Sequence, residues 1–195
     1  MQAEPDPSPE TPSLIRRRRP FLAPIWLLGL AAIVFLATAF AYWHSATTTT
    51  IVLIRHAEKQ VGAIPDAPLS PPGEVRAARL AQMFGDGGAF GRVQKIYVTD
   101  TRRTQQTAAG VAQRLGLTAE IVAAKEDAGS FARRLLRENR GGRALVVGHS
   151  NTVPAIVAAL AHRDDVPSMD DEEFDTVYIV SVPTIGQASV LRLKY

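Results

Sequence analysis

Residues 51–58 read Ile-Val-Leu-Ile-Arg-His-Ala-Glu, and this stretch decides the fold. Its first four residues are an unbroken apolar run, which is typical of a strand buried on both faces of a parallel sheet. Strand–helix alternation along the rest of the chain predicts an α/β three-layer sandwich, with a mainly parallel central sheet and helices on both faces. Further strands are expected at 96–98, 120–122 (a weaker candidate), 144–147, 177–182 and 189–193, and helices at 72–84, 101–115, 130–139 and 152–162.

Polar residues follow three of these apolar runs. Arg55 and His56 come directly after the first run, and His149 follows the run at 144–147. Arg102 and Arg103 follow the run at 96–98. Chemistry in such sheets collects at the carboxyl ends of the strands, so we interpret these residues as parts of one active site.

Phosphoryl transfer is the chemistry that these residue types suit. A neutral imidazole is a good nucleophile near neutral pH and can form a covalent phosphohistidine. Arginine forks bind the phosphoryl oxygens in pairs, and the helix expected after Gly148 should add backbone N–H groups at its N-terminus. No metal and no cofactor is expected, because the side chains supply the positive charge.

Four short motifs resemble those of the histidine phosphatase superfamily, also called phosphoglycerate mutase-like. The stretch LIRHAE at 53–58 resembles its Arg-His-Gly motif, with Ala57 in the place of the usual glycine. The resemblance covers residues 50–195. The other motifs are RTQQTA at 103–108 for Arg-x-x-x-Thr-Ala, VGHSNT at 147–152 for the second histidine, and LSPPGE at 69–74 for Leu-Thr-x-x-Gly at the first helix.

The resemblance implies a role for each matching residue. His56 would be the nucleophile that becomes phosphorylated, and Arg55 and Arg103 would bind the phosphoryl oxygens. His149 would complete the pocket and stabilise the pentavalent transition state. Arg103 is preferred to its neighbour Arg102 because it stands four residues before the Thr-Ala pair, as in the family pattern.

The proton donor of the family is not identified by these motifs. Glu126 and Asp127 follow the weaker strand at 120–122, and each could be the donor or a solvated loop acid. An alkoxide leaving group needs such an acid, whereas a phosphoramidate needs much less help. Absence of a donor would favour phosphohistidine-type substrates. Glu58 and Asn151 could support the pocket or simply shape turns.

The expected function is that of a metal-independent histidine phosphatase acting on phosphoric monoesters or phosphoramidates. Its partners would be phosphorylated small molecules or phosphoproteins. A mutase is disfavoured because the domain has little room for the insertions that enclose a diphosphorylated substrate. The alternative is a catalytically silent domain of the same fold that binds phospho-ligands. A net charge of +3 without a basic face argues against nucleic acid, and zero cysteines exclude thiolate metal sites and disulfides.

The amino-terminal part of the chain predicts a membrane anchor. Residues 21–43 contain no charge, and as a helix of about 35 Å they are long enough to cross a bilayer. Four arginines at 16–19 favour a cytoplasmic N-terminus, so the domain at 51–195 would lie outside the cytoplasmic (inner) membrane. Residues 1–20 are expected to be a disordered tail and 44–50 a linker. A cleaved signal peptide is the competing interpretation, with 39–41 as a small-x-small site.

Seven acids stand within the twelve residues 164–175 (DDVPSMDDEEFD). Their spacing does not fit an EF-hand calcium loop, which needs a central glycine and a terminal glutamate. A solvated loop before the strand at 177–182 is the favoured interpretation.

Overall fold

The computed structural model describes residues 25–62, 65–87 and 91–195 of the chain. The tail predicted over 1–20 and the first four residues of the predicted span lie outside these ranges. The chain divides into two units, residues 1–39 and 40–195. The elements are α1 (Ile25–Thr47), β1 (Thr49–Arg55), α2 (Pro71–Phe84), β2 (Lys95–Thr99), α3 (Arg102–Leu115), β3 (Ala119–Val122), α4 (Ala128–Glu138), β4 (Arg143–Gly148), α5 (Thr152–Ala161), β5 (Thr176–Val182) and β6 (Ser189–Lys194).

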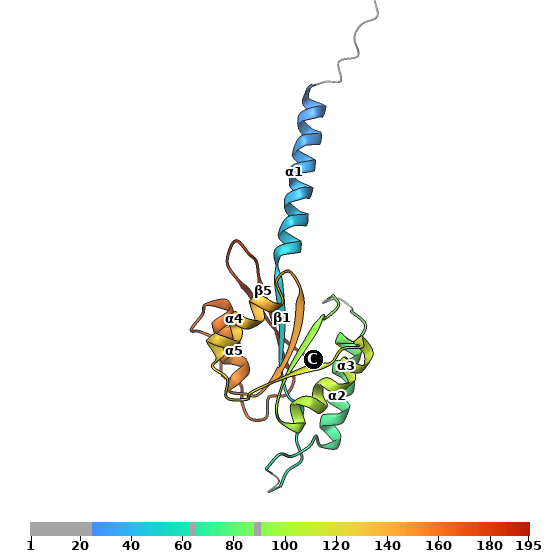
Figure 1. Cartoon of the computed structure of the whole chain (residues 1–195), viewed down its shortest axis with the longest axis vertical. Coiled ribbons are helices and arrows are strands. Elements are labelled where there is room, and N and C mark those ends of the chain that lie inside the picture. The colour runs from blue at the N-terminus through green and yellow to red at the C-terminus, as the bar shows by residue number, and fades with distance from the viewer. Residues whose placement is uncertain (1–24, 63–64, 88–90) are drawn as a thin grey trace, which may run out of the picture. The chain divides into compact units, whose positions relative to one another are not determined.

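The six strands form one sheet in the order β3-β2-β4-β1-β5-β6. The first four strands along the chain run parallel to one another, whereas β5 pairs antiparallel with β1 and β6 antiparallel with β5. The predicted mainly parallel sheet is therefore confirmed. The two crossover helices on each side give the three layers visible in Figure 1, with α2 and α3 on one face and α4 and α5 on the other.

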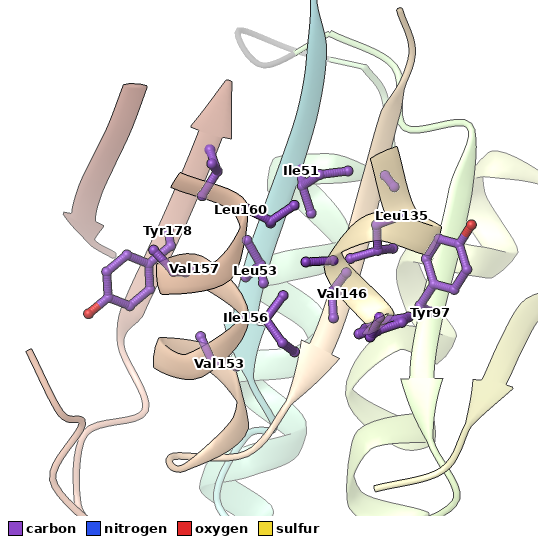
Figure 2. Close-up of a cluster of buried hydrophobic side chains, with 14 of the residues drawn as sticks. Ile51, Leu53, Tyr97, Leu135, Val146, Val153, Ile156, Val157, Leu160 and Tyr178 are labelled. Atoms are coloured by element: carbon purple, nitrogen blue, oxygen red, sulfur yellow. The ribbon is translucent and has the colours of Figure 1, made fainter. Parts of the chain in front are cut away.

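Alternate residues of the central strand β1 enter two separate cores. Ile51 and Leu53 pack with α4 and α5, and Figure 2 shows them facing Ile156 and Leu160 of α5. Val52 and Ile54 enter the opposite core, against α2 and α3. Each fully buried side chain of this kind contributes roughly 1.5–3 kcal/mol of transfer free energy. This two-sided burial explains why the β1 sequence is apolar at every position from 51 to 54, and it holds the end of β1 rigidly.

The apolar stretch near the N-terminus forms the helix α1. Its segment from Ile25 to Trp43 has a mean hydropathy of 2.2 and is long and apolar enough to cross a membrane. A signal sequence has the same properties, so the helix is a candidate span.

Residues 44–50, predicted as a linker, include the end of one element and the start of the next. Helix α1 continues to Thr47 and β1 already begins at Thr49, which leaves Thr48 alone between them. The stretch contains no glycine or proline that would stop the helix, and Thr47 Oγ1 donates back to the Trp43 carbonyl at 3.0 Å. The β-branched Thr49 and Thr50 then join the sheet, opposite β5 and β4.

Candidate active site

The two predicted site histidines lie at the carboxyl ends of neighbouring strands. Arg55 at the end of β1 pairs in register with Gly148 at the end of β4, so the next residue of each strand is a histidine. The His56 N–H extends the ladder by donating to the Gly148 carbonyl at 2.9 Å. This register brings the rings of His56 and His149 to a centroid distance of 5.3 Å, edge to face at 65°.

One ring nitrogen of His56 is fixed by the backbone. His56 Nδ1 lies 2.8 Å from the Ala57 carbonyl oxygen, which can only accept, so Nδ1 carries the proton and donates. The lone pair of the neutral ring is therefore on Nε2. Ala57 is itself held by its N–H, which donates to Thr107 Oγ1 at 2.9 Å. The Thr107 hydroxyl in turn donates to the Arg103 carbonyl at 2.7 Å, so the Thr-Ala motif of α3 holds the backbone beside the imidazole.

His149 is held by β2 and by the start of α5. Its Nε2 lies 2.9 Å from Thr99 Oγ1, and its Nδ1 lies 3.5 Å from Arg103 Nη2. The guanidinium can only donate, so this contact favours the tautomer with the proton on Nε2. The His149 N–H donates to Thr152 Oγ1 at 2.9 Å.

The backbone N–H groups expected at the start of α5 are partly occupied. Those of Thr152 and Val153 donate to the His149 carbonyl at 3.2 and 3.0 Å. These two N–H groups are therefore not free to bind a phosphoryl group, contrary to the expectation. What they still offer an anion is the positive end of the α5 helix dipole. The physical reason is the tight turn after Gly148, which folds the first turn of the helix back onto His149.

The guanidinium groups of buried Arg55 and half-buried Arg103 complete the site. Arg55 Nη1 donates to the carbonyls of Asp170 and Glu173 at 2.7 and 3.2 Å, and Arg55 Cζ lies 4.1 Å from the centre of the Phe174 ring. Arg103 contacts His149 through Nη2, as above. Among the described residues, the buried Nε atoms of both arginines have no hydrogen-bond partner. Two unpartnered cationic donors beside two histidines are what an oxyanion site requires.

Burial and positive charge act together on the histidines. Burial, with the nearby charges of Arg103 and Arg55, lowers the pKa of His149 to about 4. Burial, with smaller contributions from His149 and the same two arginines, lowers the pKa of His56 to about 3. Burial also lowers the pKa of Arg55, which remains cationic. Both imidazoles are therefore neutral near pH 7, as a nucleophilic histidine must be.

These pKa shifts predict that stability falls with pH below neutrality. An unfolded histidine has a pKa near 6.5. Between about pH 6.5 and pH 4 the two histidines therefore bind protons in the unfolded chain but stay neutral in the folded site. The free energy of unfolding should then decrease as pH falls through this window. We expect the urea midpoint of the full chain, in nonionic detergent, to be lower at pH 5.5 than at pH 7.5. The variant His56→Gln should show a smaller decrease, and an equal midpoint for wild type at both pH values would contradict the depressed pKa values.

Of the two neighbouring arginines, the structure brings Arg103 to His149. Arg102 is exposed, and its N–H donates to the two Asp66 carboxylate oxygens at 3.0 and 3.2 Å. Asp66 also lies 3.9 Å from Arg103 Nη1. Asp66 was not predicted as a neighbour of the site, because it lies in the loop before α2 and no spacing in the sequence relates it to α3.

The hydrogen-bond and ion-pair partners of both candidate proton donors lie outside the set of histidines and arginines. Asp127 accepts the Ser130 N–H at 2.8 Å and caps α4, and Glu126 pairs with Arg134 at 2.8 Å. Glu58 forms a two-pronged ion pair with Arg76, whose Nη2 lies 2.7 Å from Glu58 Oε1. Asn151 is exposed and makes no side-chain cap bond at α5. The carboxylates of Asp127, Glu126 and Glu58 therefore have structural partners, and Glu126 also lines a small cavity with Thr99 and Thr152.

The prediction of a solvated loop over 164–175 was incomplete. The side chains of Asp170, Asp171 and Glu172 are exposed, but the loop backbone accepts from Arg55 and Phe174 packs on the same guanidinium. Only the run of charge was visible in the sequence, and it gave no signal of a backbone contact made across 115 residues.

Solved structures of phosphatases have the same fold. A protein histidine phosphatase SixA in complex with tungstate is 20% identical, with a TM-score of 0.63 over 74% of this chain and 96% of that one. A phosphatase from Escherichia coli, assigned to alpha-ribazole-5'-P, is 16% identical, with a TM-score of 0.59 over 75% and 96%. SixA from Agrobacterium tumefaciens is 16% identical, with a TM-score of 0.56 over 75% and 98%. Comparison with curated protein sequences gave no match.

Residues 51–128 match the model of the histidine phosphatase superfamily, branch 1. Three of the four motifs, at 53–58, 69–74 and 103–108, lie within the matched residues. The match agrees with the resemblance that the motifs predicted.

Proposed function

We propose that the domain is a metal-independent histidine phosphatase that works through a phosphohistidine at His56. The observation that carries the proposal is the Nε2 lone pair of a neutral His56, which is left free because Nδ1 donates to the backbone. The centre of the His56 ring lies 5.3 Å from that of His149, and the buried Nε atoms of Arg55 and Arg103 have no hydrogen-bond partner among the described residues. SixA structures with the same fold bear the name phosphohistidine phosphatase, which supports a phosphoryl substrate for this chain.

The first step of the proposed reaction is transfer of the phosphoryl group to the protein. Arg55 and Arg103 donate to the phosphoryl oxygens and compensate the charge that spreads over them. The Nε2 lone pair of His56 forms the P–N bond while the bond from phosphorus to the leaving atom breaks, and the leaving group departs with that electron pair. The Nδ1–H bond to the Ala57 carbonyl stabilises the positive charge that develops on the ring.

Hydrolysis of the phosphohistidine completes the cycle. Water attacks phosphorus, the P–N bond breaks, and its electron pair returns to Nε2, which regenerates neutral His56. One proton of the water passes to a phosphoryl oxygen, so that the product leaves as dihydrogen phosphate. His149 is neutral in the free site, but a phosphoryl dianion placed against it favours its charged form and raises its pKa. Since Glu126 and Asp127 have structural partners, the proposed substrates are those with labile leaving groups, phosphoramidates before alkyl esters.

We further propose that α1 is an uncleaved anchor, with the N-terminus in the cytoplasm and the phosphatase domain outside the cytoplasmic membrane. The proposal is supported by the apolar segment from Ile25 to Trp43 and by the four arginines at 16–19. The length of the apolar segment favours an anchor over a signal sequence.

A single preparation tests both proposals. Membranes from cells that express the full chain should hydrolyse para-nitrophenyl phosphate in the presence of a chelator, and vanadate should inhibit this activity. The protein should remain in the membrane pellet with a mass that includes residues 1–20. Bound oxyanion without turnover of either para-nitrophenyl phosphate or phosphohistidine would favour the silent binding domain instead. Activity in the soluble fraction, on a chain shortened at 39–41, would contradict the anchor alone.

A further inference from the structure

The loop between α5 and β5 forms one wall of the proposed phosphoryl site. Its backbone carbonyls at Asp170 and Glu173 accept both bonds from Arg55 Nη1, and its Phe174 ring covers the same guanidinium at 4.1 Å. The Phe174 ring also lies 6.0 Å from the His56 ring, centre to centre. A ligand that reaches His56 therefore passes beside this loop, whose residues 170–175 we call the acidic wall.

The charge of the acidic wall is only partly compensated. Glu173 pairs with Arg192, and Asp175 lies 3.4 Å from Lys194. The side chains of Asp170, Asp171 and Glu172 are exposed and form no ion pair with the described residues. The negative charges of three carboxylates are thus uncompensated in the solvent next to the site.

A cavity of about 580 Å³ opens along the acidic wall. Besides the wall it is lined by Arg76 and Lys194, but Arg76 is committed to Glu58 and Lys194 to Asp175. The cavity shares Phe174 with the phosphoryl site. Arg55, only 6% exposed, stands at the boundary with its Nε unpartnered, so a buried anion-binding group adjoins a cavity with excess negative charge.

The negative charge along the cavity is the opposite of what a site for polyanions needs. A nucleotide or a sugar diphosphate carries further negative charge beyond the reacting phosphoryl group, and the acidic wall would repel it. A ligand with an ammonium or guanidinium group next to its phosphoryl group would meet attraction at both ends. Asp171 and Glu173 already act on Arg55 by favouring its charged form, so their field reaches the phosphoryl end of the site.

We propose that the acidic wall selects phosphorylated ligands whose non-reacting part carries positive charge. The inference rests on the proposed function, because it names the substrate class of that same site. The selectivity is electrostatic. Arg55 and Arg103 bind the phosphoryl group, and Asp171 and Glu172 attract the cationic group of the ligand in the cavity. Compounds with a further anionic group are excluded by the same carboxylates.

Three small phosphates that differ in one terminal group provide the test. Calorimetry on the full chain in nonionic detergent measures the dissociation constants of aminoethyl phosphate, ethyl phosphate and carboxymethyl phosphate (phosphoglycolate). We expect binding to weaken in that order, with about a tenfold difference between the first and the last at low salt. The difference should shrink toward twofold in 0.5 M salt, because exposed charges are screened.

The double variant Asp171→Asn, Glu172→Gln should bring the three dissociation constants within about twofold of one another. The charge-matched control Asp86→Asn, Glu120→Gln removes two exposed acids outside the wall and should keep the wild-type order. Equal binding of all three phosphates to wild type, or an unchanged order in the first variant, overturns the inference and leaves the proposed function standing. Failure of ethyl phosphate to bind at all overturns the phosphoryl site itself, and the inference with it.

Discussion

Replacing His56 with alanine should abolish both turnover and covalent labelling of the protein. With a radioactive phosphoramidate as donor, wild type should acquire a label that survives alkali and is lost in acid, as expected of a P–N bond. His56→Ala should acquire none, and its kcat should fall by about 10³-fold or more, since loss of a covalent nucleophile has cost about 10⁶-fold in a well-studied protease. The reason is geometric, because His56 is the ring whose Nδ1–H is tied to the backbone and whose Nε2 is left free.

His162 provides the matched control for this experiment. It is an exposed histidine at the C-terminus of α5, with φ of 52°. Asparagine tolerates this left-handed conformation, so His162→Asn should keep the wild-type label and turnover. Acid-labile label that persists in His56→Ala would place the phosphoryl group elsewhere and contradict the assigned nucleophile. His149→Asn should still accept label but at a much lower rate, because its ring lies beside the nucleophile.

Replacing Gly73 with alanine should damage both stability and activity. Gly73 is the third residue of α2 and has ordinary helical backbone angles, so alanine is conformationally allowed there. A Cβ at this position, however, would overlap the backbone carbonyl oxygen of Glu58. That carbonyl already accepts the Ser70 N–H at 2.9 Å, and Glu58 is two residues from His56. The backbone that carries the nucleophile must therefore move.

We expect Gly73→Ala to lower the free energy of unfolding by about 1–3 kcal/mol, the usual cost of overpacking. A displacement near 1 Å at the nucleophile should reduce kcat by about 10²-fold. Urea unfolding and turnover of para-nitrophenyl phosphate, both on the full chain, measure the two effects. The glycine of the fourth motif is thus explained by the close approach of α2 to the strand end.

Gly129 in the first turn of α4 is the control for the helix itself. A Cβ there would meet Arg133 Nη1 and Asp127 Oδ1 at 3.5 Å, which is ordinary contact. Gly129→Ala should therefore stabilise the protein by about 0.5–1 kcal/mol through helix propensity, with unchanged turnover. If Gly73→Ala behaved the same way, the packing of α2 against Glu58 would not restrain the site.

The sequence was most informative where burial and chemistry coincide. The apolar runs predicted β1, β2, β4 and β5, because a strand covered on both faces carries few polar residues. The edge strands β3 and β6 are largely exposed and contain polar residues, so their sequence signal was weaker. The residues after Arg55 and Gly148 could be placed together from the rule that chemistry gathers at the carboxyl ends of strands. The helix after the second strand was predicted to within one residue, since Gly116 adopts the left-handed conformation that ends it.

What the sequence did not reveal depends on contacts between distant segments. Nothing in the pattern showed that β5 would pair antiparallel with β1, because the direction of a buried strand leaves no mark on its composition. The contact of Asp66 with α3 and the bonds from Arg55 to the loop at 170–175 involve groups far apart in the chain. The bounds of α1 and β1 within 44–50 could not be predicted for a local reason: a threonine-rich stretch can end a helix and begin a strand as readily as it can form a coil.

Thr184 Oγ1 donates to the Thr47 carbonyl at 3.0 Å, so the loop between β5 and β6 holds the chain where it enters β1. At the other end of the same strand, the His56 N–H donates to the Gly148 carbonyl at 2.9 Å. The strand that leads to the proposed nucleophile is therefore fixed by a hydrogen bond at its start as well as at its end.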